Sequence, residues 1–541
     1  MIDAAPRHRR PPAAPWGIWA ALSICGLFFA LQVGALDYGT TINNLPHIAR
    51  YQIKNADAAA SAIDRPNLIL DKTSYRESLD KQMLRFKLYS VESDEVVNIM
   101  ALARMKPAEL KLDPGFYVYG GGWFYPLGAW YFALAKLGVI EIGPLSAMAA
   151  ADRMDAVYIY GRLFVLIAVT LSGLVFFAAA VRLVPAGSAC LMLGLYFAAP
   201  ATVMFSEVMK PHWYALLWVN VAILLMLRAY QDHRFGWGAS ALTGVMLGLA
   251  VGSAQTYGLF AVLVWVALLM AAVRGEVRWH HPLVVPLVAL VVFLIVNPYA
   301  VVNWQGYFAE RAKVTTDWFS LVVNPKYVWL FVFNSMLSGL GIAFTLLLLA
   351  LAIWRLAVGA ALDRWMVVGL LFSIVVVGYV SASLSHWHIN MRYAPYLPSL
   401  AILFVGASLA RRRGQWLGLC LLLTLVQAFP LWLAYRDEDS VAHSTRLRAA
   451  RWVEANIPAG AGLQLGTGQP APYEVPPIDL ARYRLNPTDW RYQVRVERQS
   501  DRVDVPVGTT LAARFAPRLT TPLFPFVYSH INPQISIYKR P

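Results

Sequence analysis

The sequence contains little charge and few cysteines. Of its 541 residues, 14% are charged and 58% are hydrophobic, and the mean hydropathy is +0.51. A soluble protein carries roughly 25% charged residues. The three cysteines, Cys25, Cys190 and Cys420, all lie inside apolar runs, which excludes a disulfide framework and a cysteine zinc site. The scarcity of charge predicts a protein whose solvent is largely lipid.

Long apolar runs take the place of charge. Runs of about 20 residues recur between residues 16 and 435, and a helix of this length spans a bilayer. The predicted fold is an all-α polytopic membrane protein with about 11 transmembrane helices. The predicted spans are 16–36, 157–181, 187–205, 213–229, 237–253, 256–273, 281–298, 328–354, 365–384, 394–409 and 415–435.

One further apolar stretch, YGGGWFYPLGAWYFALAKLGV (119–139), decides the topology. If it does not cross the membrane, the N-terminal arginines and the basic clusters of the later connections all fall on the cytoplasmic side, as the positive-inside rule requires. We therefore predict an interfacial or re-entrant helix at 119–139, a cytoplasmic N-terminus and an external C-terminus. The net charge of +15 is explained by lipid contact, so no nucleic-acid partner is predicted.

The predicted outer face collects the polar segments: loop 37–118, connections 206–212 and 385–393, loop 299–327 and the tail. The tail is rich in turn residues and then alternates, as in RYQVRVERQ (491–499), which predicts a small mixed or β-rich domain. The predicted domains are a cytoplasmic N-terminus (1–15), a transmembrane domain (16–436) and an extracytoplasmic C-terminal domain (437–541). Within the first outer loop, segment 41–88 has no assigned role.

An acid pair stands at the head of a predicted helix in YSVESDEVVNIMALARM (89–105). Ser93 is predicted to cap the helix, which places Asp94 and Glu95 in its first turn, where the helix dipole favours negative charge. Helix capping is one interpretation of the pair. The other is a carboxylate held at the membrane surface as a general base.

The segments that follow give this pair a context. After the helix come a Pro-aromatic turn and an aromatic helix, KLDPGFYVYGGGWFYPLGAWYF (111–132). This order resembles the lipid-carrier-dependent glycosyltransferases of the GT-C class. The most similar branch contains the bacterial protein O-mannosyltransferases and the lipid A aminoarabinose transferase. The resemblance implies that Asp94 is the catalytic base.

Further segments of the chain resemble this family in the same order. YIYGRLFVLI (158–167) is similar to its Gly-Arg segment and carries Arg162; SEVMKPHWYALLWVN (206–220) resembles its Lys-Pro-Asp turn and carries Lys210 and His212. NPYAVVNWQGYFAE (297–310), HWHINMRYAPYLPSLAILF (386–404) and TRLRAARWVEANIPAGAGL (445–463) resemble later segments. Two departures stand out. His212 replaces the family's aspartate, and VYGGG (118–122) replaces an acidic residue and a lysine, so a metal site is not carried over.

The candidate substrate-binding residues are predicted at the outer ends of spans. Cations there could hold the phosphate of a lipid-linked donor, and interfacial anchoring is the alternative explanation. Arg162 lies inside an apolar segment, where charge is costly and usually functional. Asp37, directly after the first span, is a rival base, and its alternative role is to end that span. The candidate set is Glu95, Tyr119, Arg162, Lys210, His212, His386, His388, Arg392 and Tyr393.

The predicted function is an inverting glycosyltransferase of the bacterial inner membrane. By the resemblance, its partners are a polyprenyl-phosphate-linked sugar donor, membrane lipids and a lipid, glycan or protein acceptor. Glu95 is predicted to orient the surroundings of Asp94 or a substrate hydroxyl. No cofactor is assigned, and a divalent metal stays an open option. Two alternatives remain: a polytopic transporter or lipid flippase, and a non-catalytic envelope assembly protein.

Overall fold

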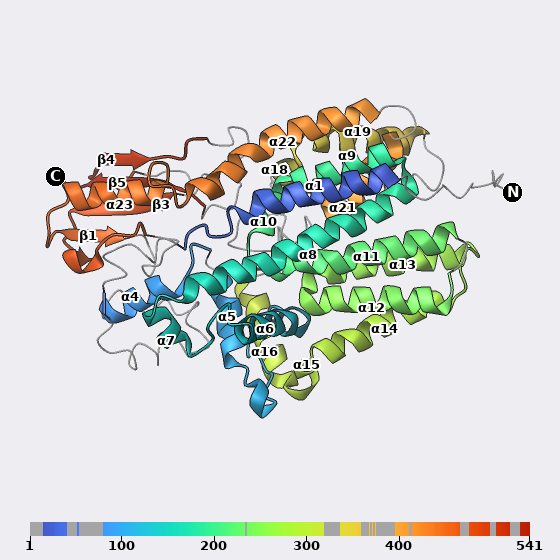
Figure 1. Cartoon of the computed structure of the whole chain (residues 1–541), viewed down its shortest axis with the longest axis horizontal. Helices are drawn as coiled ribbons and strands as arrows, with labels where there is room; N and C mark the ends of the chain where they lie inside the picture. Colours follow the sequence, from blue (N-terminus) through green and yellow to red (C-terminus); the bar gives the residue numbers. More distant parts are fainter. Residues whose placement is uncertain are drawn as a thin grey trace.

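The computed structural model describes residues 15–40, 51–52, 79–92, 94–232, 235–318, 336–358, 367, 370–371, 374, 395–409, 414–465, 475–497, 505–519 and 531–541. The described chain is elongated and mostly helical, with a small sheet at one end (Figure 1). The long helices run roughly along the long axis. Their sheet-facing ends carry the residues of the candidate site described below.

Five segments of the described chain are long and apolar enough to cross a membrane. They are α1 (Pro15–Val33), α8 (Met154–Leu183), α11 (Pro211–Gln231), the segment Gln255–Val273, made of η2 (Gln255–Tyr257) and α13 (Gly258–Val273), and Gln415–Asp437 within α22 (Gly414–Asp437). A bent pair, α9 (Ala186–Ala198) and α10 (Pro200–Ser206), adds a sixth. Shorter apolar helices are α12 (Trp237–Ser253), α14 (His281–Val296), α19 (Ile342–Val358) and α21 (Leu397–Leu409). A polytopic helical architecture agrees with the prediction, whereas the count of 11 spans is not confirmed.

Two predicted spans are interrupted, and each break has a local cause. The run 187–205 is bent by 59° between α9 and α10. Pro200 has no N–H to continue the helix and keeps Ala199 out of the helical region, with ψ 124°. In the run 328–354, a short helix α18 (Leu337–Leu340) is separated from α19 by Gly341, whose φ is +97°. The predicted span 365–384 lies almost wholly outside the described residues.

Helices α12 and α14 pack closely because three glycines face the contact. Cβ atoms added at Gly244, Gly248 and Gly252 would lie 2.7, 2.6 and 2.4 Å from atoms of α14. Small residues repeated at four-residue spacing allow helices to approach in this way. The contact continues into α6 (Gly121–Lys136), since Asn297 Oδ1 accepts from Gly121 N at 2.8 Å and a Cβ at Gly120 would lie 1.8 Å from Gly252 O. The three glycines of VYGGG are therefore required by backbone packing, since Cβ atoms at Gly121 and Gly122 would also lie within 3 Å of backbone atoms.

Several shorter helices, which fall in the predicted outer loops or directly after the first of them, lie near the sheet-facing end of the bundle (Figure 1). They are α4 (Leu79–Leu88), α5 (Glu95–Arg104), η1 (Pro107–Glu109), α6, α7 (Leu145–Ala150), α15 (Tyr299–Val302) and α16 (Trp304–Trp318). In Figure 1, α6 runs across the direction of the long helices. The interfacial placement of 119–139 stays a prediction.

A small sheet with a packed helix follows α22. The helix is α23 (Thr445–Asn456), and the strands are β1 (Gly462–Leu465), β2 (Arg484–Leu485), β3 (Tyr492–Glu497), β4 (Thr510–Phe515) and β5 (Gln534–Lys539), with η5 (Leu480–Arg482) before β2. The order is β2-β1-β3-β5-β4, with β1 parallel to both neighbours and β5 antiparallel to both of its own. Its core includes Val453, Ile537 and, from α4, Phe86. A small C-terminal sheet agrees with the predicted mixed or β-rich domain, whereas its bounds and its extracytoplasmic side stay predictions.

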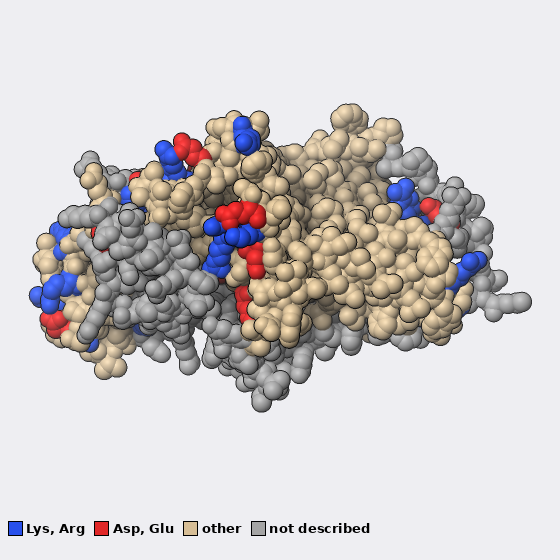
Figure 2. Space-filling view, turned by 90° about the horizontal axis from the view of Figure 1, so that it is seen from below, with Lys and Arg blue, Asp and Glu red and all other residues tan. Residues whose placement is uncertain are grey.

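The distribution of charge fits a lipid-embedded bundle. In Figure 2, charged side chains lie toward the sheet end, at the upper edge, in a central patch and at the opposite end, whereas the described surface between the central patch and the opposite end shows none. Large apolar side chains are exposed on several helices, for example Leu283 (67%) on α14 and Val426 (64%) on α22. In water such a surface would drive aggregation, whereas in a bilayer it faces lipid.

Candidate active site

The acid pair stands at the start of α5, but its side chains do not serve as caps. Asp94 is the N-cap residue and makes no capping hydrogen bond, and the helix begins at Glu95. The predicted cap, Ser93, lies outside the described residues. Asp94 instead pairs with Lys210, with 2.9 Å from Oδ2 to Nζ. Capping therefore does not explain the two acids.

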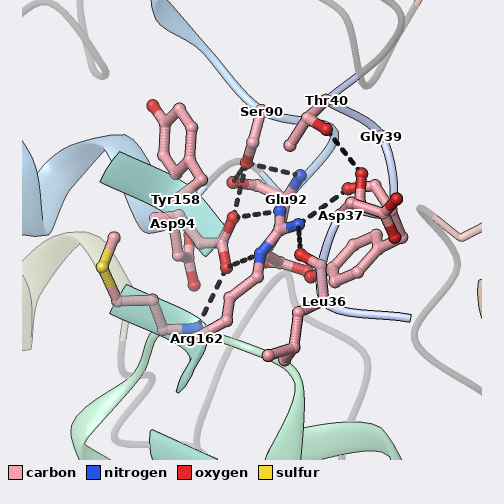
Figure 3. Close-up of polar contacts among 12 residues, drawn as sticks. Leu36, Asp37, Gly39, Thr40, Ser90, Glu92, Asp94, Tyr158 and Arg162 are labelled. Atoms are coloured by element: carbon pink, nitrogen blue, oxygen red, sulfur yellow. Dashed lines mark hydrogen bonds and ion pairs between the residues drawn. The ribbon is translucent and has the colours of Figure 1, made fainter. Parts of the chain in front are cut away.

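Glu95 is fully buried and is held by Arg162 of α8. Arg162 donates from Nε to Oε1 at 2.9 Å and from Nη2 to Oε2 at 2.7 Å (Figure 3). Ser90 Oγ and Met209 N donate to the same carboxylate at 2.7 and 3.0 Å. Both charged side chains are 0% exposed, so the bidentate pairing compensates the cost of burying each charge.

Arg162 also binds the turn that follows α1. Its Nη1 donates to the carbonyl oxygens of Leu36 and Tyr38 at 2.8 and 2.7 Å, and the guanidinium lies 3.7 Å from the centre of the Tyr38 ring. Arg162 therefore joins α8, α5 and this turn. Glu95 and Arg162 were predicted to bind substrate, and their mutual burial favours a positioning role.

Lys210 is shared between two carboxylates. Its ammonium lies 2.9 Å from Glu92 Oε1 as well as 2.9 Å from Asp94 Oδ2. Burial raises the pKa of the Glu92 carboxyl to about 7, and the Lys210 charge acts in the opposite direction. We call Glu92, Asp94, Glu95, Arg162 and Lys210 the charged cluster. Within it, Asp94 is 30% exposed, and the other four side chains are at most 2% exposed.

The turn before α11 brings two more predicted residues to this place. Lys210 precedes Pro211, the first residue of α11, and His212 follows in the first turn. The His212 ring meets Tyr119 edge to face, with centroids 5.7 Å apart. Asp94, Tyr119 and the turn that carries Lys210 and His212 thus come together from three separate segments of the chain.

Other predicted residues are placed differently. His386, His388, Arg392 and Tyr393 lie outside the described residues. Asp37, the rival base, is exposed on the turn bound by Arg162, and its carbonyl accepts from Thr40 Oγ1 at 2.6 Å (Figure 3). Asp94 is partly exposed and precedes Glu95, whereas Asp37 is exposed and lies between the two residues whose carbonyls bind Arg162.

Sequence reasoning missed Glu92 and Glu207. Glu92 lies in the same YSVESDE stretch (89–95), but no spacing rule pairs it with a lysine 118 residues away. Glu207 follows α10 and is 0% exposed. Among the residues that the structure describes, neither of its carboxylate oxygens has a hydrogen-bond partner. The sequence signal for Glu207 is its position three residues before Lys210 of the Lys-Pro motif.

The described residues offer no ready-made metal site. No group of three or more His, Cys, Asp or Glu side chains among them could hold an ion. Glu92 and Asp94 already share the ammonium of Lys210, so the donor set of the cluster does not fit a divalent metal.

No family model and no curated protein matches the chain. Solved structures with a distant similarity include the following two. The archaeal oligosaccharyltransferase AglB from Archaeoglobus fulgidus, in complex with an inhibitory peptide and a dolichol-phosphate, is 11% identical with a TM-score of 0.40, over 83% of this chain and 69% of that one. Arabinofuranosyltransferase AftD from Mycobacteria is 14% identical with a TM-score of 0.38, over 90% of this chain but only 39% of AftD. Similarity at this level does not assign the chain to a family.

Proposed function

We propose that the chain is an inverting glycosyltransferase of the bacterial inner membrane. It transfers a sugar from a polyprenyl-phosphate donor to a lipid, glycan or protein acceptor on the extracytoplasmic face. The observation that carries the proposal is the exposure of Asp94, which is 30% exposed at the edge of an otherwise buried charged cluster. The ordered motifs that resemble the GT-C class support the type of reaction.

In the proposed reaction, Asp94 takes the proton of the acceptor hydroxyl or amine. The acceptor atom attacks the anomeric carbon while the bond from that carbon to the phosphate oxygen breaks. The polyprenyl phosphate leaves with the electron pair, and the anomeric configuration inverts. A positioned base of this kind contributes about 10²–10⁴-fold in rate.

The leaving phosphate gains charge as the bond breaks, and cations near the base would stabilise it. Lys210 and His212 are the proposed groups, because Lys210 pairs with Asp94 and His212 lies two residues further along, in the first turn of α11. The proposal extends to His386, His388, Arg392 and Tyr393, which lie outside the described residues. Tyr119 would contact the donor from the side of His212.

One observation favours the transporter or flippase as a second candidate. Glu207 is a buried carboxyl without a hydrogen-bond partner among the described residues, and it stands at the end of the bent helix pair α9–α10. Unpaired ionisable groups and broken helices are common at translocation sites. The ordered outer motifs have no role in this alternative.

The test is donor turnover by purified protein in detergent. The wild type, Asp94→Asn and Asp37→Asn are compared on a panel of polyprenyl-phosphate sugars, with release of polyprenyl phosphate measured. Glu109→Gln is the matched control, since the Glu109 carboxylate forms exposed ion pairs with Lys106 and Lys111, which flank η1. We expect the control to match the wild type and Asp94→Asn to lose about 10²–10⁴-fold in kcat.

Each other outcome has a defined meaning. Equal turnover by wild type and Asp94→Asn would show that Asp94 is not the base, and loss in Asp37→Asn would assign that role to Asp37. If no donor turns over but a fluorescent polyprenyl lipid is moved across reconstituted vesicles, the second candidate replaces the first.

A further inference from the structure

Three consecutive acids at the end of α22, Asp437, Glu438 and Asp439, divide their contacts between two parts of the molecule. Asp437 pairs with Arg518, with 2.9 Å from Oδ2 to Nε and 2.5 Å from Oδ1 to Nη2. Glu438 accepts from Arg446 Nε at 2.8 Å and from the Asn532 backbone N–H. Arg518, Arg446 and Asn532 all belong to the C-terminal domain. The first two acids therefore fasten the end of α22 to that domain.

The third acid, Asp439, binds the turn that follows α1. Both of its carboxylate oxygens accept from Gly39 N, each at 2.9 Å. Gly39 lies in the turn after α1 with φ +70°, and a Cβ there would lie 2.2 Å from Val91 Cγ2. The turn is thus held by Asp439 on one side and pressed against Val91, the residue before Glu92, on the other.

The same turn supplies the carbonyls that bind Arg162. Leu36 O and Tyr38 O accept from Arg162 Nη1, and Arg162 in turn holds Glu95, the residue after Asp94. The charge of Asp439 also acts on Arg162. A continuous set of contacts therefore runs from the C-terminal domain through Asp439, the turn and Arg162 to the start of α5.

We propose that Asp439 is a positioning residue, which couples the C-terminal domain to the orientation of Asp94. This inference rests on the proposed function. It implies that loss of the Asp439 contact lowers the rate of the chemical step more than it weakens substrate binding, because small displacements of a base lower the rate steeply.

The experiment compares Asp439→Ala with Asp437→Asn in the full-length protein. Asp437 is the matched control, since it lies two residues away and pairs with Arg518 of the C-terminal domain, not with the turn. Asp439→Asn keeps one side-chain acceptor oxygen and should partly restore the function lost in Asp439→Ala. Amide hydrogen exchange of segment 36–40 is measured beside kcat and KM.

For Asp439→Ala we expect exchange in segment 36–40 to be about tenfold faster, as loss of a charge-assisted hydrogen bond predicts. We expect kcat to fall about 10- to 100-fold with KM changed less than about twofold, and Asp437→Asn to keep both constants near wild type. Unchanged exchange would overturn the proposed contact whatever the activity.

Faster exchange with an unchanged kcat would overturn the positioning role and leave the glycosyltransferase standing. A failure of the proposed function looks different, because the wild type itself would then turn over no donor. That result would remove the positioning role together with the function, while the exchange data would still report the contact between Asp439 and the turn.

Discussion

Arg162 and Glu95 form a bidentate ion pair in which neither side chain is exposed to solvent. Removing one partner of such a pair leaves a buried, unpaired charge, at a typical cost of 3–5 kcal/mol. We expect Glu95→Gln and Arg162→Met each to lower the midpoint of thermal unfolding in detergent. The double variant Glu95→Gln/Arg162→Met should lose less than the sum of the two. Additive losses would show that the two side chains do not interact.

The Glu92 carboxyl makes stability depend on pH. Burial raises its pKa from an ordinary value of 4.5 to about 7. Its contribution is therefore fully present below pH 4.5 and is lost as the pH rises through about 7, by at most about 3 kcal/mol. Thermal midpoints measured from pH 5 to pH 8 should fall in the wild type and fall less in Glu92→Gln. Parallel curves for the two proteins would contradict the raised pKa.

Glycine is required at position 39 for two separate reasons. The backbone has φ +70°, which L-residues rarely adopt, and a Cβ would lie 2.2 Å from Val91 Cγ2. We expect Gly39→Ala to destabilise the protein by roughly 1–3 kcal/mol and to lower turnover, since the turn carries the carbonyls that bind Arg162. The control is Gly138→Ala, because Gly138 also has a positive φ, of 70°, but no heavy atom lies within 4 Å of its added Cβ. A similar loss in both variants would mean that backbone strain alone, without the contact to Val91, accounts for the effect.

The sequence predicted the features that depend on local pattern. Apolar run length placed α1, α8, α11 and α22, and alternation placed β3, because these signals need no knowledge of distant segments. Pro200 gave a local signal for the bend, because proline removes a helical hydrogen bond. The signal is not decisive, since Pro126, Pro286 and Pro430 lie inside continuous helices. The four-residue spacing of Gly244, Gly248 and Gly252 is a further sequence signal, since it indicates a close helix–helix contact.

The pairing of charges could not be predicted in the same way. Glu95 and Arg162 are 67 residues apart, and Lys210 and Glu92 are 118 apart. The local sequence around these residues does not identify their ion-pair partners, because the pairs form only when α5, α8 and the turn before α11 pack together. The sequence therefore indicates that the acid pair is unusual. Only the folded structure shows that Glu95 is buried and that Asp94 is partly exposed.

Glu207 separates the two candidate functions. Burial raises the pKa of its carboxyl well above the ordinary value, and the charges of Arg162 and Arg436 act in the opposite direction. The protonated form is therefore favoured in the folded protein, and stability falls as the pH rises toward the raised pKa. Glutamine mimics the protonated acid, so Glu207→Gln should match the wild type at low pH and be more stable at alkaline pH.

The same variant separates the two functions by activity. In the glycosyltransferase, Glu207 has no part in the reaction, and Glu207→Gln should keep kcat within about twofold of wild type while Asp94→Asn loses about 10²–10⁴-fold. A transporter that uses Glu207 as its proton site would show the reverse, with transport lost in Glu207→Gln and retained in Asp94→Asn.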